Sequence, residues 1–145
     1  MAVALKQENV ITEIGHYGVV HSWFSTVATR LEDSKWGSKF PTVMLSLHQG
    51  KLRNDQGKAA LLELKSIAES LSKLSTSELV WDAEDHAKRP PPEHQKNPKA
   101  TSLVNYFLTA NGLDLTQEFI GNVESMIEFG GDLEIISVNL PPPRR

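Results

Sequence analysis

The segment from Gln56 to Leu74 carries the strongest structural signal in the chain, because its apolar residues recur at intervals of three and four. This period places them on one face of an α-helix, and lysines and glutamates occupy the opposite face. Asn54 or Asp55 is the expected cap at its start. A helix of this kind is stable only when its apolar face packs on other elements, so the fold needs a second layer. The apolar face consists of Leu61, Leu64, Ile67, Ala68, Leu71 and Leu74.

Three other segments also have the apolar spacing of helices. The pattern predicts a first helix over residues 19–32 and a short helix over residues 42–48. It predicts a last helix over residues 115–129, with Asp114 or Thr116 as its N-terminal cap. The first of these helices has a polar side opposite its apolar face, so we expect it to pack on a sheet or on another helix.

Residues that favour β-structure predict a hairpin of two strands near residues 2–6 and 10–14, and further strands over 79–81, 103–108 and 133–138. Strands and helices do not alternate regularly enough for a parallel, doubly wound sheet. We therefore expect an α+β fold, with a mostly antiparallel sheet and about three to four helices packed on one face.

The length of the chain predicts a single domain. Its 145 residues are enough to bury one core without disulfides, and 39% of them are hydrophobic. We expect the domain to span residues 1–140 and residues 141–145 to form a frayed tail of proline and arginine. No apolar run approaches the roughly 20 residues that a membrane span needs, so no membrane partner is predicted.

Charge and cysteine content narrow the functional classes. The formal net charge is −3, and the basic residues of the long loop after residue 86 have no aromatic residues between them, so no nucleic-acid partner is predicted. Cysteine is absent, which excludes disulfides, thiol nucleophiles and thiolate metal ligands. The first residues also show no signal-peptide pattern, and these observations together predict a cytoplasmic protein.

Residues 80–92 show the most abrupt change of character in the sequence. A short apolar segment leads through Trp81 into Asp82, Glu84 and Asp85, and the chain then turns basic and reaches three consecutive prolines. Carboxylates at this density suit a divalent cation or a cationic protein surface, and the simplest interpretation is a solvated loop. On a strand, Asp82 and Glu84 would share one face and Asp85 would point away, which disfavours a metal site.

The remaining polar residues predict no catalytic, metal or cofactor site. The histidines are not spaced as pairs of metal ligands, and a catalytic pairing among His16, His21 and His86 is disfavoured. No glycine-rich phosphate loop or nucleophile elbow occurs in the sequence. The five histidines are His16, His21, His48, His86 and His94.

Several short motifs follow one another in order along most of the chain. They are Gly37-Ser38-Lys39-Phe40-Pro41, Gln49-Gly50-Lys51-Leu52, residues 80–85 with 88–91, and Asn105-Tyr106-Phe107 with Thr109 and Gly112. Together they resemble the immunity protein 70 family of small bacterial proteins found beside polymorphic toxins. The family pattern has an aromatic residue and a glycine after the paired prolines, where this chain has Pro92 and Glu93. The resemblance implies neutralisation of a toxin by binding, without catalysis, and assigns a role to no single residue.

The leading hypothesis is therefore a cytoplasmic immunity protein that binds and neutralises a cognate bacterial toxin domain. Its predicted partner-binding residues are Trp81, Asp82, Glu84, Asp85 and His86, because an acidic patch complements a cationic toxin site. The alternatives are a small metal-dependent hydrolase that uses Asp82, Glu84 and Asp85, and a non-catalytic adaptor.

Overall fold

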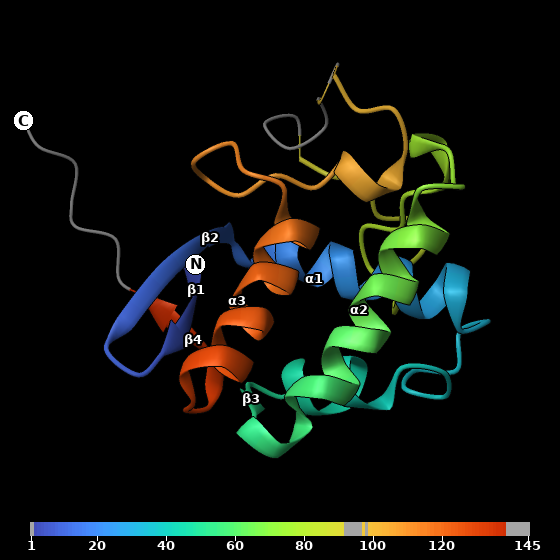
Figure 1. Ribbon diagram of the computed structural model, residues 1–145. Helices are drawn as coiled ribbons and strands as arrows, with labels where there is room; N and C mark the ends of the chain where they lie inside the picture. The colour runs from blue at the N-terminus through green and yellow to red at the C-terminus, as the bar shows by residue number, and fades with distance from the viewer. Residues whose placement is uncertain (1, 92–96, 98, 139–145) are drawn as a thin grey trace, which may run out of the picture.

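The computed structural model describes residues 2–91, 97 and 99–138. Within these residues, four strands form one antiparallel sheet in the order β2-β1-β4-β3 (Figure 1). This arrangement confirms the predicted hairpin and the predicted closing strand. The bounds are Ala2–Gln7 for β1, Val10–His16 for β2, Lys51–Leu52 for β3 and Leu133–Val138 for β4.

The helices lie on one side of the sheet, as the α+β prediction expected. In Figure 1, α2 and α3 run next to each other and α1 crosses behind them. The helical segments are α1 (Tyr17–Thr26), its π-helical continuation η1 (Val27–Leu31), the π-helical turn η2 (Thr42–Leu47), α2 (Gly57–Leu71) and α3 (Leu115–Phe129). Short 3-10 turns are η3 (Asn54–Gln56), η4 (Thr76–Glu78) and η6 (Leu103–Asn105).

The sheet presents Val3 and Leu5 of its central strand β1 to the helices. The register pairs Leu5 with Ile135 of β4, so the alternation of the strand places these side chains on the same face. Val3 and Leu5 are buried in one apolar cluster with residues of all three α-helices. The helix layer and the sheet are thus joined by a continuous core.

Trp23 lies at the centre of this core. Its ring is fully buried and packs against Phe24 and Phe119, with ring centroids 5.0 and 4.9 Å away. The indole Nε1–H donates to Thr116 Oγ1 at 2.9 Å, which satisfies the polar atom of the tryptophan and connects α1 to the first turn of α3.

The ends of α2 and α3 are locked together by two small features. A Cβ on Gly57 would lie 2.9 Å from side-chain atoms of Met126 and of Ile127, so only glycine allows this close approach. Neither Asn54 nor Asp55, the two expected caps, stands at the N-cap of α2, which is Gln56; Asn54 instead donates from Nδ2 to the carbonyls of Met126 and Gly131. The cap of α3 is Asp114, as predicted, and it accepts from the N–H of Gln117.

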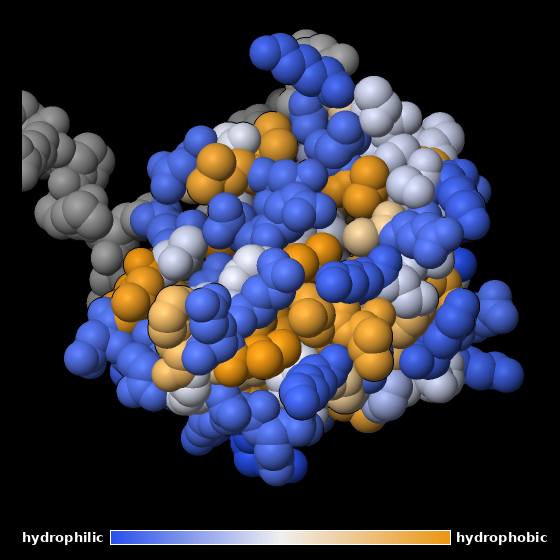
Figure 2. Space-filling model, viewed as in Figure 1, coloured by the Kyte–Doolittle hydropathy of each residue, from blue (hydrophilic) through white to orange (hydrophobic). Residues whose placement is uncertain are grey.

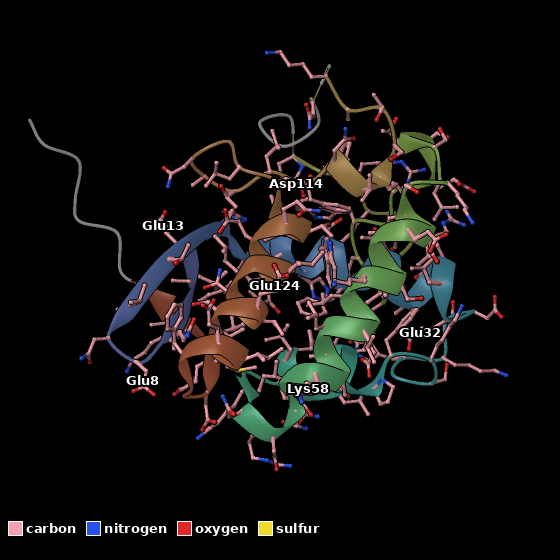
Figure 3. The ribbon with its side chains drawn as sticks, viewed as in Figure 1. Glu8, Glu13, Glu32, Lys58, Asp114 and Glu124 are labelled. Atoms are coloured by element: carbon pink, nitrogen blue, oxygen red, sulfur yellow. The ribbon has the colours of Figure 1, made fainter. Side chains whose placement is uncertain are left out.

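A buried carboxylate organises the loop after η1. The side chain of Glu32 accepts hydrogen bonds from the N–H groups of Gly37, Lys39 and Phe40 at 2.8 to 3.0 Å, and the residue is only 3% exposed (Figure 3). These bonds replace the water that the carboxylate loses on burial. One of the motifs that resembles the immunity family therefore wraps around a glutamate that the sequence did not single out.

Two predicted strands are wrong. The segment 79–81 is extended but joins no sheet, because side chains of α1 take its backbone hydrogen bonds. The segment 103–108 begins as η6, since Ser102 and Asn105 cap each other's backbone and draw the chain into a turn. Only Leu108 forms an isolated bridge, with Asp114.

The sequence also failed to predict β3, whose two residues are too few to show alternation. Among the described residues, no helix combines the length and the apolar character needed to cross a bilayer. The expected tail, residues 141–145, lies outside the described residues.

The core-facing side of α2 gives the first prediction. Leu64→Ala or Ile67→Ala should lower the free energy of unfolding by about 2–5 kcal/mol, because both side chains are fully buried and each change leaves a cavity. Denaturant unfolding measures the loss. Leu62→Ala on the same helix is the matched control, since Leu62 is 72% exposed and should change stability by no more than about 0.5 kcal/mol. Equal losses at Leu62 and Leu64 would contradict this assignment of the helix faces.

Candidate functional site

The acidic segment is fixed to α1 through the backbone of Val80. Ser22 Oγ donates to the carbonyl of Val80 at 2.7 Å, and Thr26 Oγ1 lies 3.1 Å from both the N–H and the carbonyl of Val80. Ser22 and Thr26 are fully buried and one turn apart, so they face the same segment. Two helix hydroxyls thus perform the role of a neighbouring strand.

Asp82 faces the protein and is only 19% exposed. Its Oδ1 accepts from the N–H of Glu84 at 2.9 Å and lies 3.4 Å from Nε2 of His21, while Oδ2 lies 3.5 Å from Nζ of Lys88. The N–H of Glu84 lowers the pKa of Asp82, and His21 and Lys88 lower it further, against the opposing effect of burial. Asp82 is therefore an ionised group that holds the loop in place.

Glu84 and Asp85 have the opposite environment, since both side chains are exposed. The N–H of Asp85 donates to the carbonyl of Asp82 at 3.2 Å, and Oδ1 of Asp85 accepts from the N–H of Ala87 at 3.1 Å. Residues 82–88 thus form two successive turns rather than the end of a strand. The expectation that Asp82 and Glu84 share one strand face and Asp85 points away rested on a strand that the structure lacks.

The structure separates Trp81 and His86 from these exposed carboxylates. Both residues line a cavity of about 350 Å³ that neither Glu84 nor Asp85 reaches. The Trp81 ring also lies against the start of α1, where a Cβ on Gly18 would be 2.8 Å from Cζ2 of Trp81. The five predicted partner-binding residues therefore divide into an exposed acidic pair, Glu84 and Asp85, a half-buried anchor, Asp82, and two cavity residues.

A pair of histidines that sequence reasoning did not bring together lines a second cavity, of about 220 Å³, between α1 and β4. His21 stacks on Tyr17, and its ring centroid is 6.5 Å from that of His48. Burial lowers the pKa of His48, and the neighbouring His21 lowers it further. In the described part of the chain, Nδ1 of His21 is buried without a hydrogen-bond partner.

The described residues of this region provide no set of metal ligands. Across residues 2–91, 97 and 99–138, no three His, Cys, Asp or Glu side chains are grouped closely enough to hold a metal ion. Asp82 is already engaged by His21 and Lys88, whereas Glu84 and Asp85 are exposed. The hydrolase alternative thus has no set of described side chains to support it.

The fold and this site define a small α+β protein whose distinctive surface is an exposed acidic turn, residues 82–88, that follows directly on the segment held by α1 at Val80. Residues 5–135 match the family described as Immunity protein 70, and the chain belongs to that family. Compared with curated proteins and with solved structures, the chain has no match in either set.

The anchoring of the acidic turn can be tested by removing a hydroxyl of α1 that holds Val80. Thr26→Val should lower the free energy of unfolding by about 1–3 kcal/mol, because it leaves the buried N–H of Val80 without its partner. Thermal or denaturant unfolding measures the loss. Ser25→Ala is the control: among the described residues, the buried hydroxyl of Ser25 has no hydrogen-bond partner, so its removal should cost little. A greater loss for Ser25→Ala than for Thr26→Val would refute the anchor.

His48 should make stability depend on pH. The lowered pKa of His48 means that the folded side chain resists a proton that the unfolded chain accepts below about pH 6.5, so stability falls as the pH drops through that value and until the folded side chain also takes up the proton. His48→Gln should flatten this part of the curve, measured by urea unfolding at several pH values. The exposed His86 is the control, since His86→Gln should leave the slope in place. An unchanged slope in His48→Gln would contradict the prediction.

Proposed function

We propose that this protein neutralises a cognate toxin by binding it, with Glu84 and Asp85 at the centre of the interface. The observation that carries the proposal is the family match over residues 5–135, because immunity proteins protect against a toxin. The match leaves the contact surface open, and the exposure of Glu84 and Asp85 supports the choice of the acidic turn. The proposal includes a bacterial cytoplasmic location and a polymorphic toxin as partner, and it requires no catalysis by this chain.

The charge available to a partner comes from Glu84 and Asp85. Lys88 and His21 already engage Asp82, whereas both side chains of the acidic pair are exposed. Two outward carboxylates favour encounter with a cationic surface, such as the site of a toxin that acts on nucleic acid. Neutralisation would then follow from occlusion of that site.

Anchoring makes this turn suitable for tight binding. Its start is held by Ser22 and Thr26, and its interior by bonds from Glu84 and Ala87 to carboxylate oxygens. A segment that is ordered before it meets its partner loses less conformational entropy on docking than a flexible one. The turn should therefore bind without rearrangement of α1.

The test reverses the charge of the turn while it keeps the fold. Glu84→Lys combined with Asp85→Asn changes the charge by three units and retains an acceptor for the N–H of Ala87. Affinity for the cognate toxin should fall by several kcal/mol and association should slow, whereas the stability should stay within about 0.5 kcal/mol of the wild type. The measurements are binding kinetics at two salt concentrations and a melting curve.

A matched control makes the same charge change elsewhere. Glu124→Lys with Glu128→Gln alters the exposed side of α3, where Figure 3 shows Glu124, and should leave the affinity unchanged. If only this control weakens binding, the proposed interface is wrong. The helix layer would then be the better choice, because Figure 2 shows apolar side chains gathered over α2 and α3, and Leu62 of α2 is exposed.

A further inference from the structure

The cavity beside Trp81 has the lining of an anion site. It has a volume of about 350 Å³ and lies between η1, η4 and the segment 86–90. This volume is within the range of about 300–1,000 Å³ that is typical of small-molecule sites. None of its described lining residues is a carboxylate. They are Arg30, Thr76, Ser77, Leu79, Val80, Trp81, His86, Lys88, Arg89 and Pro90.

Two guanidinium groups in this lining are held by the backbone. Arg30 Nε donates to the carbonyl of Glu78 at 2.9 Å, and Arg89 Nη1 donates to the carbonyl of His86 at 3.1 Å. A guanidinium carries five N–H donors, so these bonds orient both side chains and leave further donors for a ligand. Within the described residues, neither arginine is paired with a carboxylate.

The charge and the lining of the cavity together indicate the class of ligand that would fit it. Lys88 is partly neutralised by Asp82, so among the described residues the two arginines are the lining cations without a carboxylate partner. A phosphate monoester carries about −1.5 to −2 charges at pH 7 and three acceptor oxygens, which matches two arginines assisted by the hydroxyls of Thr76 and Ser77. Leu79, Trp81 and Pro90 supply an apolar wall that a bare phosphate ion would leave unused.

We propose that this cavity binds the phosphate group of a small organic ligand, up to the size of a mononucleotide. The site is distinct from the acidic turn, since Glu84 and Asp85 do not line it. It is also independent of the proposed toxin binding, because the free protein can be tested without any toxin.

Calorimetric titration of the free protein tests the proposal with inorganic phosphate, adenosine monophosphate, adenosine and acetate. We expect millimolar or tighter binding of adenosine monophosphate, weaker binding of phosphate, and none of adenosine or acetate. The proposal would be overturned if neither inorganic phosphate nor adenosine monophosphate gave heat at concentrations up to about 10 mM. A dissociation constant above that concentration corresponds to a binding free energy smaller than about 3 kcal/mol. Equal binding of acetate would also overturn it, since it would remove the selectivity for phosphate.

Variants locate the site. Arg30→Gln with Arg89→Gln should weaken binding of adenosine monophosphate at least about tenfold, or 1.4 kcal/mol. Arg89→Gln alone changes only an exposed side chain, so this variant should fold. It should lose less affinity for adenosine monophosphate than the double variant, and it keeps the test valid if the double variant unfolds. The control, Lys58→Gln with Lys65→Gln, makes the same charge change on the exposed side of α2 and should keep affinity within about twofold. Equal losses in the control and the arginine variants would place the phosphate outside this cavity.

Discussion

The structure depends on hydrogen bonds that α1 supplies to the backbone of the segment after η4. In a sheet, a neighbouring strand would supply these bonds. The carbonyl and N–H of Val80 are buried, and a buried backbone group without a partner costs about 1–3 kcal/mol. Ser22 and Thr26 provide the partners from a single helix turn. Since the same helix also carries Trp23 into the core and His21 to Asp82, one amphipathic segment positions both the hydrophobic core and the acidic turn.

Carboxylates in this protein divide into structural groups and surface charges according to the N–H groups that surround them. Glu32 is enclosed by three backbone donors, Asp82 by one donor and two basic side chains, and Asp114 by the first turn of α3. Burial raises the pKa of Asp114 against its two backbone hydrogen bonds, whereas the surroundings of Asp82 lower its pKa. Counting acidic residues in the sequence therefore overestimates the charge that is free to meet a partner, and within the acidic segment 82–85 only Glu84 and Asp85 are exposed.

Helices and strands whose apolar residues recur at a regular spacing were predictable, because that spacing determines which side chains are buried. The helix α3 and the strand β4 have the predicted bounds, and the apolar residues Leu64 and Ile67 of α2 are buried as expected. The segments 79–81 and 103–108 have equally β-favouring residues, yet side chains from distant or neighbouring positions take their backbone bonds. The same limit applied to the site: the sequence identified the acidic residues, but only the fold shows that Asp82 points inward and that Arg30 and Arg89 line one cavity.

The small net charge of the protein does not reveal that opposite charges are separated locally within residues 82–90. The formal charge of −3 suggests only a weak preference for cationic partners, but residues 82–90 place two exposed carboxylates a few positions from Lys88, which pairs with Asp82, and from Arg89, which donates to a backbone carbonyl. Opposite charges that are fixed close together produce a steep local field, and such a field orients an approaching partner more than it attracts it. The anchoring of Val80 is what keeps this arrangement fixed, because a free loop of the same composition would average its charges over many conformations.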